Sequence, residues 1–484
     1  MEDRYEIVIG LEVHAQLSTL SKAFASDSAA FGGEPNTHIS VISLAHPGAM
    51  PKTNAKMVEY AIRVGLACNS EINRLNIFDR KNYFYPDLPK GYQISQDKSP
   101  ICIGGKVDIR LSEFETKTIR LHHIHMEEDA GKSIHSNDPD HSWIDFNRAG
   151  VPLVEIVSEP DMRSAEEAAL YMQEIRRLVR YLDICDGNME EGSLRCDANV
   201  SVRPRGQERL GTRVEIKNMN SIRNLRKAIV YEAERQIKLI ESGGQVMRET
   251  RTFDAQVGKT FALREKETLN DYRYFPEPDL TPIQISDETL QNIQAQMPAL
   301  PWELFDKYVR DFGLSAYDAQ LLSDEKQIAA YFEACVALYP QYKAVANWLN
   351  GDIKSYLNEH NLSISEFPVA PSGLCELLKL IDAGKISHTI ASQKILPLMI
   401  EEAPRSAEEI AKTYNWIQES NQNTLESAIR EVLAANLDKV KAYKNGKKGL
   451  QGMFMGEIMK KTQGKADPKL TQQLLQKALD EAEY

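Results

Sequence analysis

Two polar residues that can bind a metal ion alternate with apolar residues near the start of the chain. In the segment Val8-Ile-Gly-Leu-Glu-Val-His14, Glu12 and His14 are separated by one apolar residue and flanked by others. A strand points successive side chains to opposite faces, so this alternation predicts a strand with both polar groups on one face. Carboxylate oxygens and imidazole nitrogens are common ligands of divalent cations.

Two later segments repeat the pattern. In Leu194-Arg-Cys-Asp-Ala-Asn-Val200, the polar side chains are those of Arg195, Asp197 and Asn199. In Arg213-Val-Glu-Ile-Lys217, Glu215 and Lys217 alternate with Val214 and Ile216. Each segment therefore predicts a strand with an acid and a base on the same face.

A fourth acidic run contains Glu127 and Glu128 and reaches the turn-forming Gly131. Four such pieces predict that carboxylates converge on a divalent cation and on the phosphates that the cation would hold. The alternative for each segment is the water-facing side of an antiparallel sheet, where charged residues also alternate. The spacing alone leaves both interpretations open.

The size and composition indicate a folded protein of several domains. A chain of 484 residues exceeds what one hydrophobic core serves, so two to four domains are expected. With 42% hydrophobic and 26% charged residues, the composition is that of a globular protein. Six scattered cysteines indicate reduced thiols, and there is no apolar run long enough to cross a bilayer. We therefore expect a cytoplasmic protein that does not interact with membranes.

The net charge of −12 argues against nucleic acid as a partner, but the charge is unevenly distributed. Between Lys439 and Lys465 there are eight lysines and a single acid, Glu457. Such a basic segment predicts contacts with the phosphates of RNA, and a solvated helical face is the alternative. The candidate RNA-binding residues are Lys441, Lys444, Lys447, Lys448, Lys460 and Lys461.

Changes in pattern divide the chain into three parts. Short alternating segments with Gly and Pro turns predict a mixed α/β domain over residues 1–293. Ser164, with Glu167 three residues later, forms a capping-box sequence that predicts a helix packed on the sheet. Prolines between Phe275 and Pro301 interrupt regular structure, and helical patterns fill 294–404 and 405–484. The predicted class is α+β.

No standard nucleotide-binding motif is present. Ala130-Gly-Lys-Ser133 resembles the end of a P-loop, but the first glycine of that motif would fall at Met126. Any nucleotide must therefore bind to a different kind of surface.

Seven longer strings, in order along the chain, closely resemble the B subunit of the glutamyl/aspartyl-tRNA amidotransferase family. They are Tyr5–His14, Asp79–Asp87, Tyr92–Gln96, His125–Lys132, Val154–Asp161, Met189–Asn199 and Asp271–Asp279. The resemblance extends from the first residues to the last helix.

The resemblance implies a mixed α/β cradle domain, an all-helical domain and a small helical tail domain. It also implies a reaction in which ATP phosphorylates the side-chain carboxylate of Glu-tRNA(Gln) or Asp-tRNA(Asn), and ammonia then displaces phosphate to form the amide. The expected partners are the A subunit, which is a glutaminase that supplies ammonia, and the C subunit. No glutaminase signature is visible in this chain. Which of the two tRNA substrates is physiological stays open.

The resemblance also assigns site residues. It places a Mg²⁺ site on Glu12, His14, Glu128, Asp197 and Glu215, with Glu127 a neighbour that cannot be separated from Glu128. Lys132, Arg195 and Lys217 are the cations expected near phosphates, although each could equally form an ordinary salt bridge.

Two zinc sites are considered. Many relatives carry four cysteines for a structural zinc, and the matching positions here are Ala25, Asp27, Ser40 and Ser43. Hydroxyls and one carboxylate cannot form a thiolate site, so no structural zinc is expected. The density of His122, His123 and His125 suggests a second zinc site, but only His125 belongs to the matched strings.

Some alternatives remain. Aromatic residues in Tyr83-Phe-Tyr85 could stack on adenine or on the tRNA end, but a core aromatic cluster before Pro86 is favoured. A metal-dependent phosphohydrolase would use the same carboxylates without tRNA. A tRNA-binding scaffold would need only the basic tail.

Overall fold

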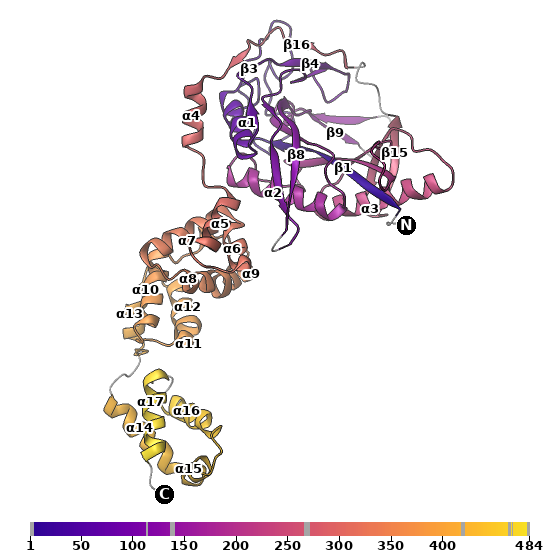
Figure 1. Cartoon of the computed structure of the whole chain (residues 1–484). Coiled ribbons are helices and arrows are strands. Elements are labelled where there is room, and N and C mark those ends of the chain that lie inside the picture. Colours follow the sequence, from indigo (N-terminus) through magenta and orange to yellow (C-terminus); the bar gives the residue numbers. More distant parts are fainter. Residues whose placement is uncertain are drawn as a thin grey trace. The chain divides into compact units, whose positions relative to one another are not determined.

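The computed structural model describes residues 4–112, 115–135, 141–265, 272–417, 422–462, 466 and 468–481. The chain divides into two compact units, Met1–Pro301 and Trp302–Tyr484. The first unit combines a large β-sheet with helices, and the described part of the second is helical (Figure 1). This arrangement confirms the predicted α+β class.

The main sheet of the first unit has β1, the first strand of the chain, in its interior. In spatial order, its strands are β15 (Lys259–Glu265), β14 (Glu249–Asp254), β13 (Val214–Lys217), β12 (Leu194–Pro204), β1 (Tyr5–Gln16), β11 (Pro152–Ser158), β8 (Thr116–Glu128), β6 (Cys102–Ile103) and β2 (Glu71–Ile72), with β7 (Lys106–Arg110) also paired to β8. Only the β13–β14 pair in this order is parallel. Because β1 pairs with both β11 and β12, it joins segments far apart in the sequence.

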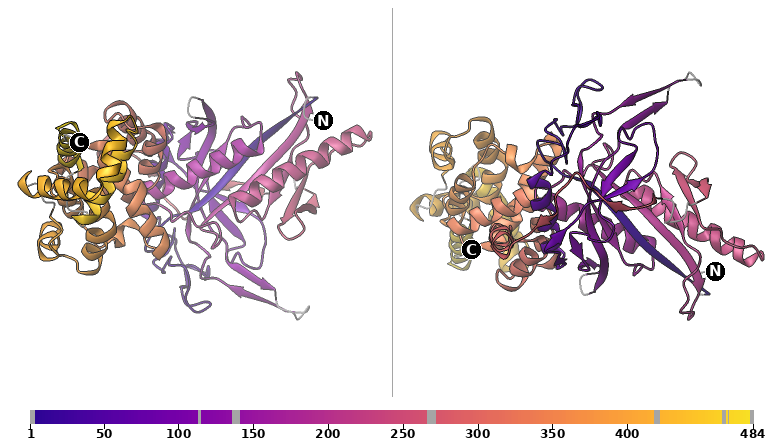
Figure 2. Two further views of the ribbon diagram at one scale, coloured as in Figure 1. Left: turned by 90° about the horizontal axis from the view of Figure 1, so that it is seen from below. Right: turned by 90° about the horizontal axis from the view of Figure 1, so that it is seen from above.

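Helices cover one face of this sheet and leave the other face polar. Helix α2 (Ala165–Tyr181) packs on β1, and α3 (Ile222–Glu241) packs on β12. Figure 2 shows these two helices side by side across the strands. In β1, Leu11 and Val13 are fully buried, whereas the alternating Glu12 and His14 on the opposite face are half-buried.

Helix α2 begins as its sequence predicts. The Ser164 side chain accepts a hydrogen bond from the backbone N–H of Glu167 at 3.1 Å. The Glu167 carboxylate, however, accepts from the N–H of Arg163 at 2.7 Å, one residue before the position expected in a capping box. The apolar residues that predict this helix are all buried: Ala168, Tyr171, Met172, Ile175, Leu178, Val179 and Leu182.

Three small sheets complete the strands of the first unit. They are β16 (Phe275–Pro276) with β4 (Asp79–Asn82) and β5 (Tyr92–Ser95), β9 (Lys132–His135) with β10 (Ser142–Asp145), and β17 (Ile283–Gln284) with β3 (Leu75–Asn76). Arg80 on β4 forms a bidentate ion pair with Glu277, with both N–O distances 2.7 Å. This pair ties two of the family-like strings together, although Asp271 of the second string lies outside the described residues.

Two further helices belong to the first unit, α1 (Ala55–Ala67) and α4 (Asp287–Ala295), which pack on each other. The remaining α-helices of the described residues are α5 (Pro301–Arg310), α6 (Ala316–Ser323), α7 (Lys326–Leu338), α8 (Tyr342–Trp348), α9 (Lys354–His360), α10 (Pro371–Asp382), α11 (His388–Ile390), α12 (Leu396–Glu401), α13 (Ala407–Thr413), α14 (Gln422–Ala435), α15 (Leu437–Lys444), α16 (Leu450–Lys461) and α17 (Pro468–Glu481). None of the described helices is both long and apolar enough to cross a membrane.

The second unit contains two hydrophobic clusters. One runs from Phe305 to Ala411, with Trp416 and Ile417 packed against it, and the other from Leu425 to Leu479. The division of this unit into a helical domain and a tail domain stays a prediction. The boundaries at residues 293 and 404 stay predictions, and α13 packs with the first of the two clusters.

Candidate cation and phosphate site

Five adjacent strands bring the alternating polar residues onto one face of the main sheet. In register, Glu12 of β1 lies opposite Asp197 of β12, and Asn199 of β12 lies opposite Glu215 of β13. On the other side of β1, His14 lies opposite Glu155 of β11. The polar face therefore carries two groups of side chains that could hold a metal ion, and both groups include a residue of β1.

The first group, called here the carboxylate cluster, consists of Glu12, Asp197 and Glu215. One carboxylate oxygen from each residue lies within 4.8 Å of the other two. Burial, together with the nearby carboxylate of Glu155, raises the pKa of Glu12 above its ordinary value. Three carboxylates this close disfavour their shared ionised state unless a cation lies among them.

Lys217 provides positive charge beside the carboxylate cluster. Its ammonium contacts the carboxylate of Asp197 and lies 3.1 Å from that of Glu215. Burial by itself would lower the pKa of Lys217, but Asp197 and Glu215 outweigh burial and raise it. Lys217 is therefore held in its charged form.

The second group, called the histidine cluster, consists of His14, Glu127 and Glu155. His14 Nε2 lies 3.2 Å from Glu155 and 3.7 Å from Glu127. A second histidine, His125, contacts the same two carboxylates at 3.3 and 3.5 Å. Glu155 thus lies between two imidazoles.

The neighbouring carboxylates favour the protonated form of both imidazoles. Burial would lower the pKa of His14, but the charge of Glu155 outweighs it and raises the pKa to about 9. The same competition raises the pKa of His125 to about 10. A histidine must lose its proton to bind a metal, so a cation entering this cluster would release protons.

The donor sets fit divalent cations of different character. The carboxylate cluster offers only oxygen, as Mg²⁺ requires. The histidine cluster adds an imidazole, which suits Mn²⁺ or Zn²⁺ better than Mg²⁺. Among the described residues, these are the two groups of three side chains close enough to share an ion.

The five residues expected to form one Mg²⁺ site thus fall in three places. Glu12, Asp197 and Glu215 lie together, and His14 belongs to the neighbouring group. Glu128 lies apart: its carboxylate is 2.6 Å from Lys90 Nζ and accepts from the backbone N–H of Ile94 at 3.0 Å. Adjacent residues on a strand point to opposite faces, so Glu127 lies on the polar face with His14 and Glu155, whereas Glu128 does not. Which of the two residues binds Mg²⁺ stays a prediction.

The three predicted phosphate-binding cations also separate. Lys217 contacts the carboxylate cluster, as described above. Arg195 pairs with the buried Asp129 at 2.8 Å, which favours the salt-bridge alternative for this residue. Lys132 lies at the start of β9, outside the main sheet.

Sequence reasoning overlooked Glu155 and Lys81. Glu155 lies in one of the family-like strings, and its alternation with Val154 and Ile156 is the signal that could have found it. Lys81 comes from β4 in a separate sheet, and its Nζ lies 5.1 Å from the ring centre of Tyr272. Burial opposes the charge of Lys81, but Glu127 and its neighbours outweigh burial and raise its pKa.

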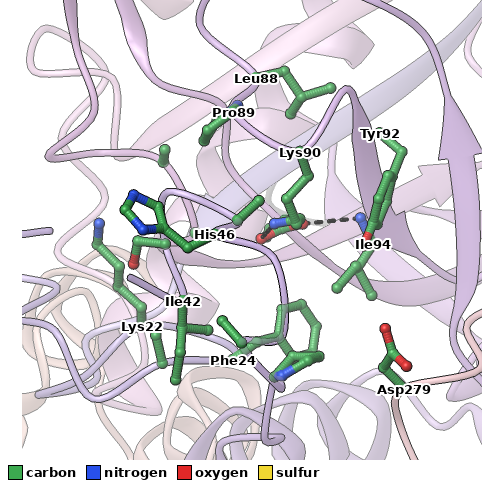
Figure 3. Close-up of a pocket in the computed structure, with 18 of the residues that line it drawn as sticks. Lys22, Phe24, Ile42, His46, Leu88, Pro89, Lys90, Tyr92, Ile94 and Asp279 are labelled. Atoms are coloured by element: carbon green, nitrogen blue, oxygen red, sulfur yellow. Dashed lines mark hydrogen bonds and ion pairs between the residues drawn. The ribbon is translucent and has the colours of Figure 1, made fainter. Parts of the chain in front are cut away.

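Figure 3 shows a cavity in the first unit. Lys22 and Lys90 both line it, together with apolar side chains and Glu128 itself. Lys22 Nζ donates to the carbonyl of Phe146 at 3.2 Å, and burial lowers the pKa of Lys22 to about 8. Burial thus makes the Lys22 amine less basic than that of an exposed lysine.

The aromatic string is not a core cluster. The Phe84 side chain is 84% exposed and Tyr85 is 54% exposed, so the favoured interpretation of a buried cluster was wrong for these two residues. Tyr83 is half-buried, and its ring centre lies 6.1 Å from that of Tyr272. Stacking on a base remains a prediction.

The residues considered for zinc have other contacts in this structure. His123 uses its two ring nitrogens for different neighbours, His122 at 2.6 Å and His125 at 3.0 Å, so the three histidines do not converge on one point. At the positions of the cysteines in relatives, Asp27 accepts from the hydroxyls of Ser40, at 3.0 Å, and Ser43. Hydrogen bonds thus join Asp27 to the segment that contains Ser40 and Ser43.

The basic tail residues lie on two helices and the connection between them. Lys441 and Lys444 lie on α15, Lys460 and Lys461 on α16, and Lys447 and Lys448 in the connection. Lys461 pairs with Glu431 of α14. Lys465, the last lysine of the predicted basic segment, lies outside the described residues.

Comparisons with known proteins cover nearly the whole chain. Residues 7–291 match the family model described as the GatB/GatE catalytic domain, and residues 330–479 match the GatB domain. The chain is 50% identical over 482 residues to the B subunit of the aspartyl/glutamyl-tRNA(Asn/Gln) amidotransferase of Synechococcus sp. (strain JA-2-3B'a(2-13)), covering 99% of this chain and 98% of that protein. It is also 50% identical over 476 residues to the corresponding protein of Chlorobaculum tepidum, covering 98% of this chain and 99% of that protein.

Proposed function

The chain belongs to the B-subunit family of the aspartyl/glutamyl-tRNA(Asn/Gln) amidotransferases, and we propose that the polar face of its main sheet is the transamidation site. It is one component of a ligase that converts misacylated Glu-tRNA or Asp-tRNA to Gln-tRNA or Asn-tRNA. The observation that carries the proposal is the pair of clusters on β1, the carboxylate cluster and the histidine cluster.

The chemistry requires activation of a carboxylate. Ammonia cannot displace oxide from a carboxylate, so phosphate must first be transferred from ATP to the side chain of the aminoacyl-tRNA. A divalent cation bound to the carboxylate cluster would neutralise charge on the transferred phosphoryl group. Magnesium and ATP are accordingly the proposed cofactors, and the oxygen-only donor set of Glu12, Asp197 and Glu215 supports this choice.

Lys217 has a second role in this scheme. In the structure its ammonium neutralises Asp197 and Glu215. A cation that binds these carboxylates takes over that task and frees the ammonium to contact phosphate oxygens. Lys217 can thus balance charge both before and after the substrates bind.

The supply of ammonia is assigned to a partner. The name of the family implies a complex of several different chains, and we propose the A and C subunits as the partners, with the A subunit as the glutaminase. All six cysteines are buried and unpaired, and burial raises the pKa of each of these thiols. They are poor nucleophiles for a glutaminase reaction, and reduced thiols agree with the proposed cytoplasmic location.

ATP hydrolysis is expected to depend on misacylated tRNA. Uncharged tRNA offers no side-chain carboxylate to accept the phosphoryl group of ATP. The assembled enzyme should therefore hydrolyse ATP much faster with Glu-tRNA(Gln) or Asp-tRNA(Asn) than with uncharged tRNA. Steady-state phosphate release with each tRNA measures this effect. Equal rates with and without tRNA would favour a phosphohydrolase, and no hydrolysis in any condition would favour a scaffold.

The tail is proposed to bind tRNA. Removing all residues after Ile417 should weaken tRNA binding about tenfold or more and flatten its salt dependence, because phosphate contacts release counterions. Ending the chain at Ile417 keeps Trp416 and Ile417, which pack on the helical cluster. Fluorescence anisotropy across a salt series measures the effect.

The control is ammonia-dependent amidation at saturating tRNA, which should largely survive because the last residue of the two clusters is Glu215. A truncated chain that binds tRNA as tightly as the full chain would show that the basic segment is only a solvated surface.

A further inference from the structure

Asn199 lies at the edge of the carboxylate cluster. It lies on β12, two residues beyond Asp197, and it is the register partner of Gly10 on β1 and of Glu215 on β13. Its side-chain Nδ2 donates a hydrogen bond to Glu12 Oε1 at 2.8 Å. The Asn199 side chain is therefore positioned between residues that carry two of the three carboxylates.

The amide oxygen of Asn199 lacks a partner. Among the described residues no donor reaches Oδ1, although the atom is buried. The orientation of the amide is fixed by charge, since rotating it by half a turn would place its oxygen against the Glu12 carboxylate. The nitrogen therefore faces Glu12, and the oxygen is left to another partner.

A buried carbonyl oxygen without a hydrogen bond destabilises a protein by about 1–3 kcal/mol. The other carboxylates have donors that orient them: Thr250 Oγ1 donates to Glu215 at 3.0 Å, and Lys217 contacts Asp197. The strands place Asn199 beside the carboxylates of Glu12 and Glu215, whose oxygens accept hydrogen bonds and cannot donate one to Oδ1. A cation shared with these carboxylates could contact Oδ1 instead.

We propose that Asn199 is a further member of the cation site, supplying its amide oxygen as a fourth oxygen ligand beside Glu12, Asp197 and Glu215 while its amide nitrogen holds Glu12 in place. Asparagine carbonyls are suitable ligands for hard cations. A neutral ligand completes more of the coordination shell without adding to the repulsion among three carboxylates. The inference rests on the proposed function of the carboxylate cluster.

The test measures Mn²⁺ and Cd²⁺ binding to the assembled enzyme, by electron paramagnetic resonance and by competition, in four variants of this chain. They are Asn199→Ala, Asn199→Cys, Asp197→Ala and the control Asn73→Ala. Asn73 is a half-buried asparagine whose side chain donates to the carbonyl of Pro100 at 3.4 Å, outside both clusters. Melting temperatures without metal show whether each variant folds.

We expect Asn199→Ala to weaken Mn²⁺ binding at one site about tenfold and Asn73→Ala to leave it unchanged. A thiolate at position 199 should favour the softer ion, so Asn199→Cys should raise the ratio of Cd²⁺ to Mn²⁺ affinity about tenfold or more over Asn199→Ala. If the alanine variant does not fold, the cysteine variant is compared with the unmodified enzyme instead.

The outcomes are distinguishable. Unchanged Mn²⁺ binding in Asn199→Ala, or no gain of Cd²⁺ preference in Asn199→Cys, would overturn the ligand role of Asn199. Unchanged binding in Asp197→Ala as well would mean that the carboxylate cluster binds no cation, and the proposed function of this cluster would be rejected with it.

Discussion

Replacing Asp197 by alanine should abolish amide formation while the chain remains folded. Asp197 supplies one of three carboxylates in the carboxylate cluster and also contacts Lys217. Its loss removes negative charge that would hold the cation against the phosphates, so we expect kcat to fall about 100-fold or more. Amide formation from misacylated tRNA, with ammonia as nitrogen donor, measures this effect.

The fold should tolerate this change. Neighbouring Cys196 and Ala198 point to the opposite, buried face and keep β12 in the sheet. We therefore expect a loss of stability of only about 1 kcal/mol. Asp108→Ala, which removes an exposed carboxylate of β7, is the matched control and should retain activity. Turnover at the unmodified rate in Asp197→Ala at saturating Mg²⁺ would contradict the assignment.

The second large effect is expected for Glu155→Gln. This substitution keeps the shape of the side chain but removes the charge that lies between His14 and His125. Because that carboxylate raises the pKa of both imidazoles, its removal should lower both pKa values. The histidine cluster also loses an anionic ligand, so its metal affinity and the rate of amidation should fall on the order of 100-fold.

Two measurements check this result. The pH dependence of the histidine ring signals in nuclear magnetic resonance reports the pKa values of His14 and His125, and amidation kinetics report the function. Glu71→Gln on the edge strand β2 is an isosteric control at an exposed residue. Unchanged histidine titration together with unchanged activity would show that the histidine cluster has no part in the reaction.

Strand alternation predicted the orientation of most site residues correctly. Glu12, His14 and Asp197 lie on the face opposite the apolar residues because Leu11, Val13 and Ala198 must face the helices. This prediction needs only local sequence, since the two-residue period of a strand decides which side chains share a face. The α+β class followed from the same patterns.

The site residues that were overlooked or left ambiguous depend on contacts that local sequence does not reveal. Glu127 and Glu128 are both acidic, so no change in polarity shows which of them shares a face with His14. Glu155 joins the site because β11 pairs with β1, and Lys81 because β4 lies near Glu127. Such pairings between distant segments are set by the whole fold.

The interior position of β1 has a consequence for how the protein is made. β1 leaves the ribosome before its partners β11 and β12, which end only at Ser158 and Pro204. Until those segments emerge, both edges of β1 lack their native hydrogen bonds, and contacts between such distant segments form slowly. Nascent chains and prematurely terminated products that end before β12 therefore cannot assemble the carboxylate cluster. The three carboxylates of this cluster thus come together only after most of the first unit has been synthesised.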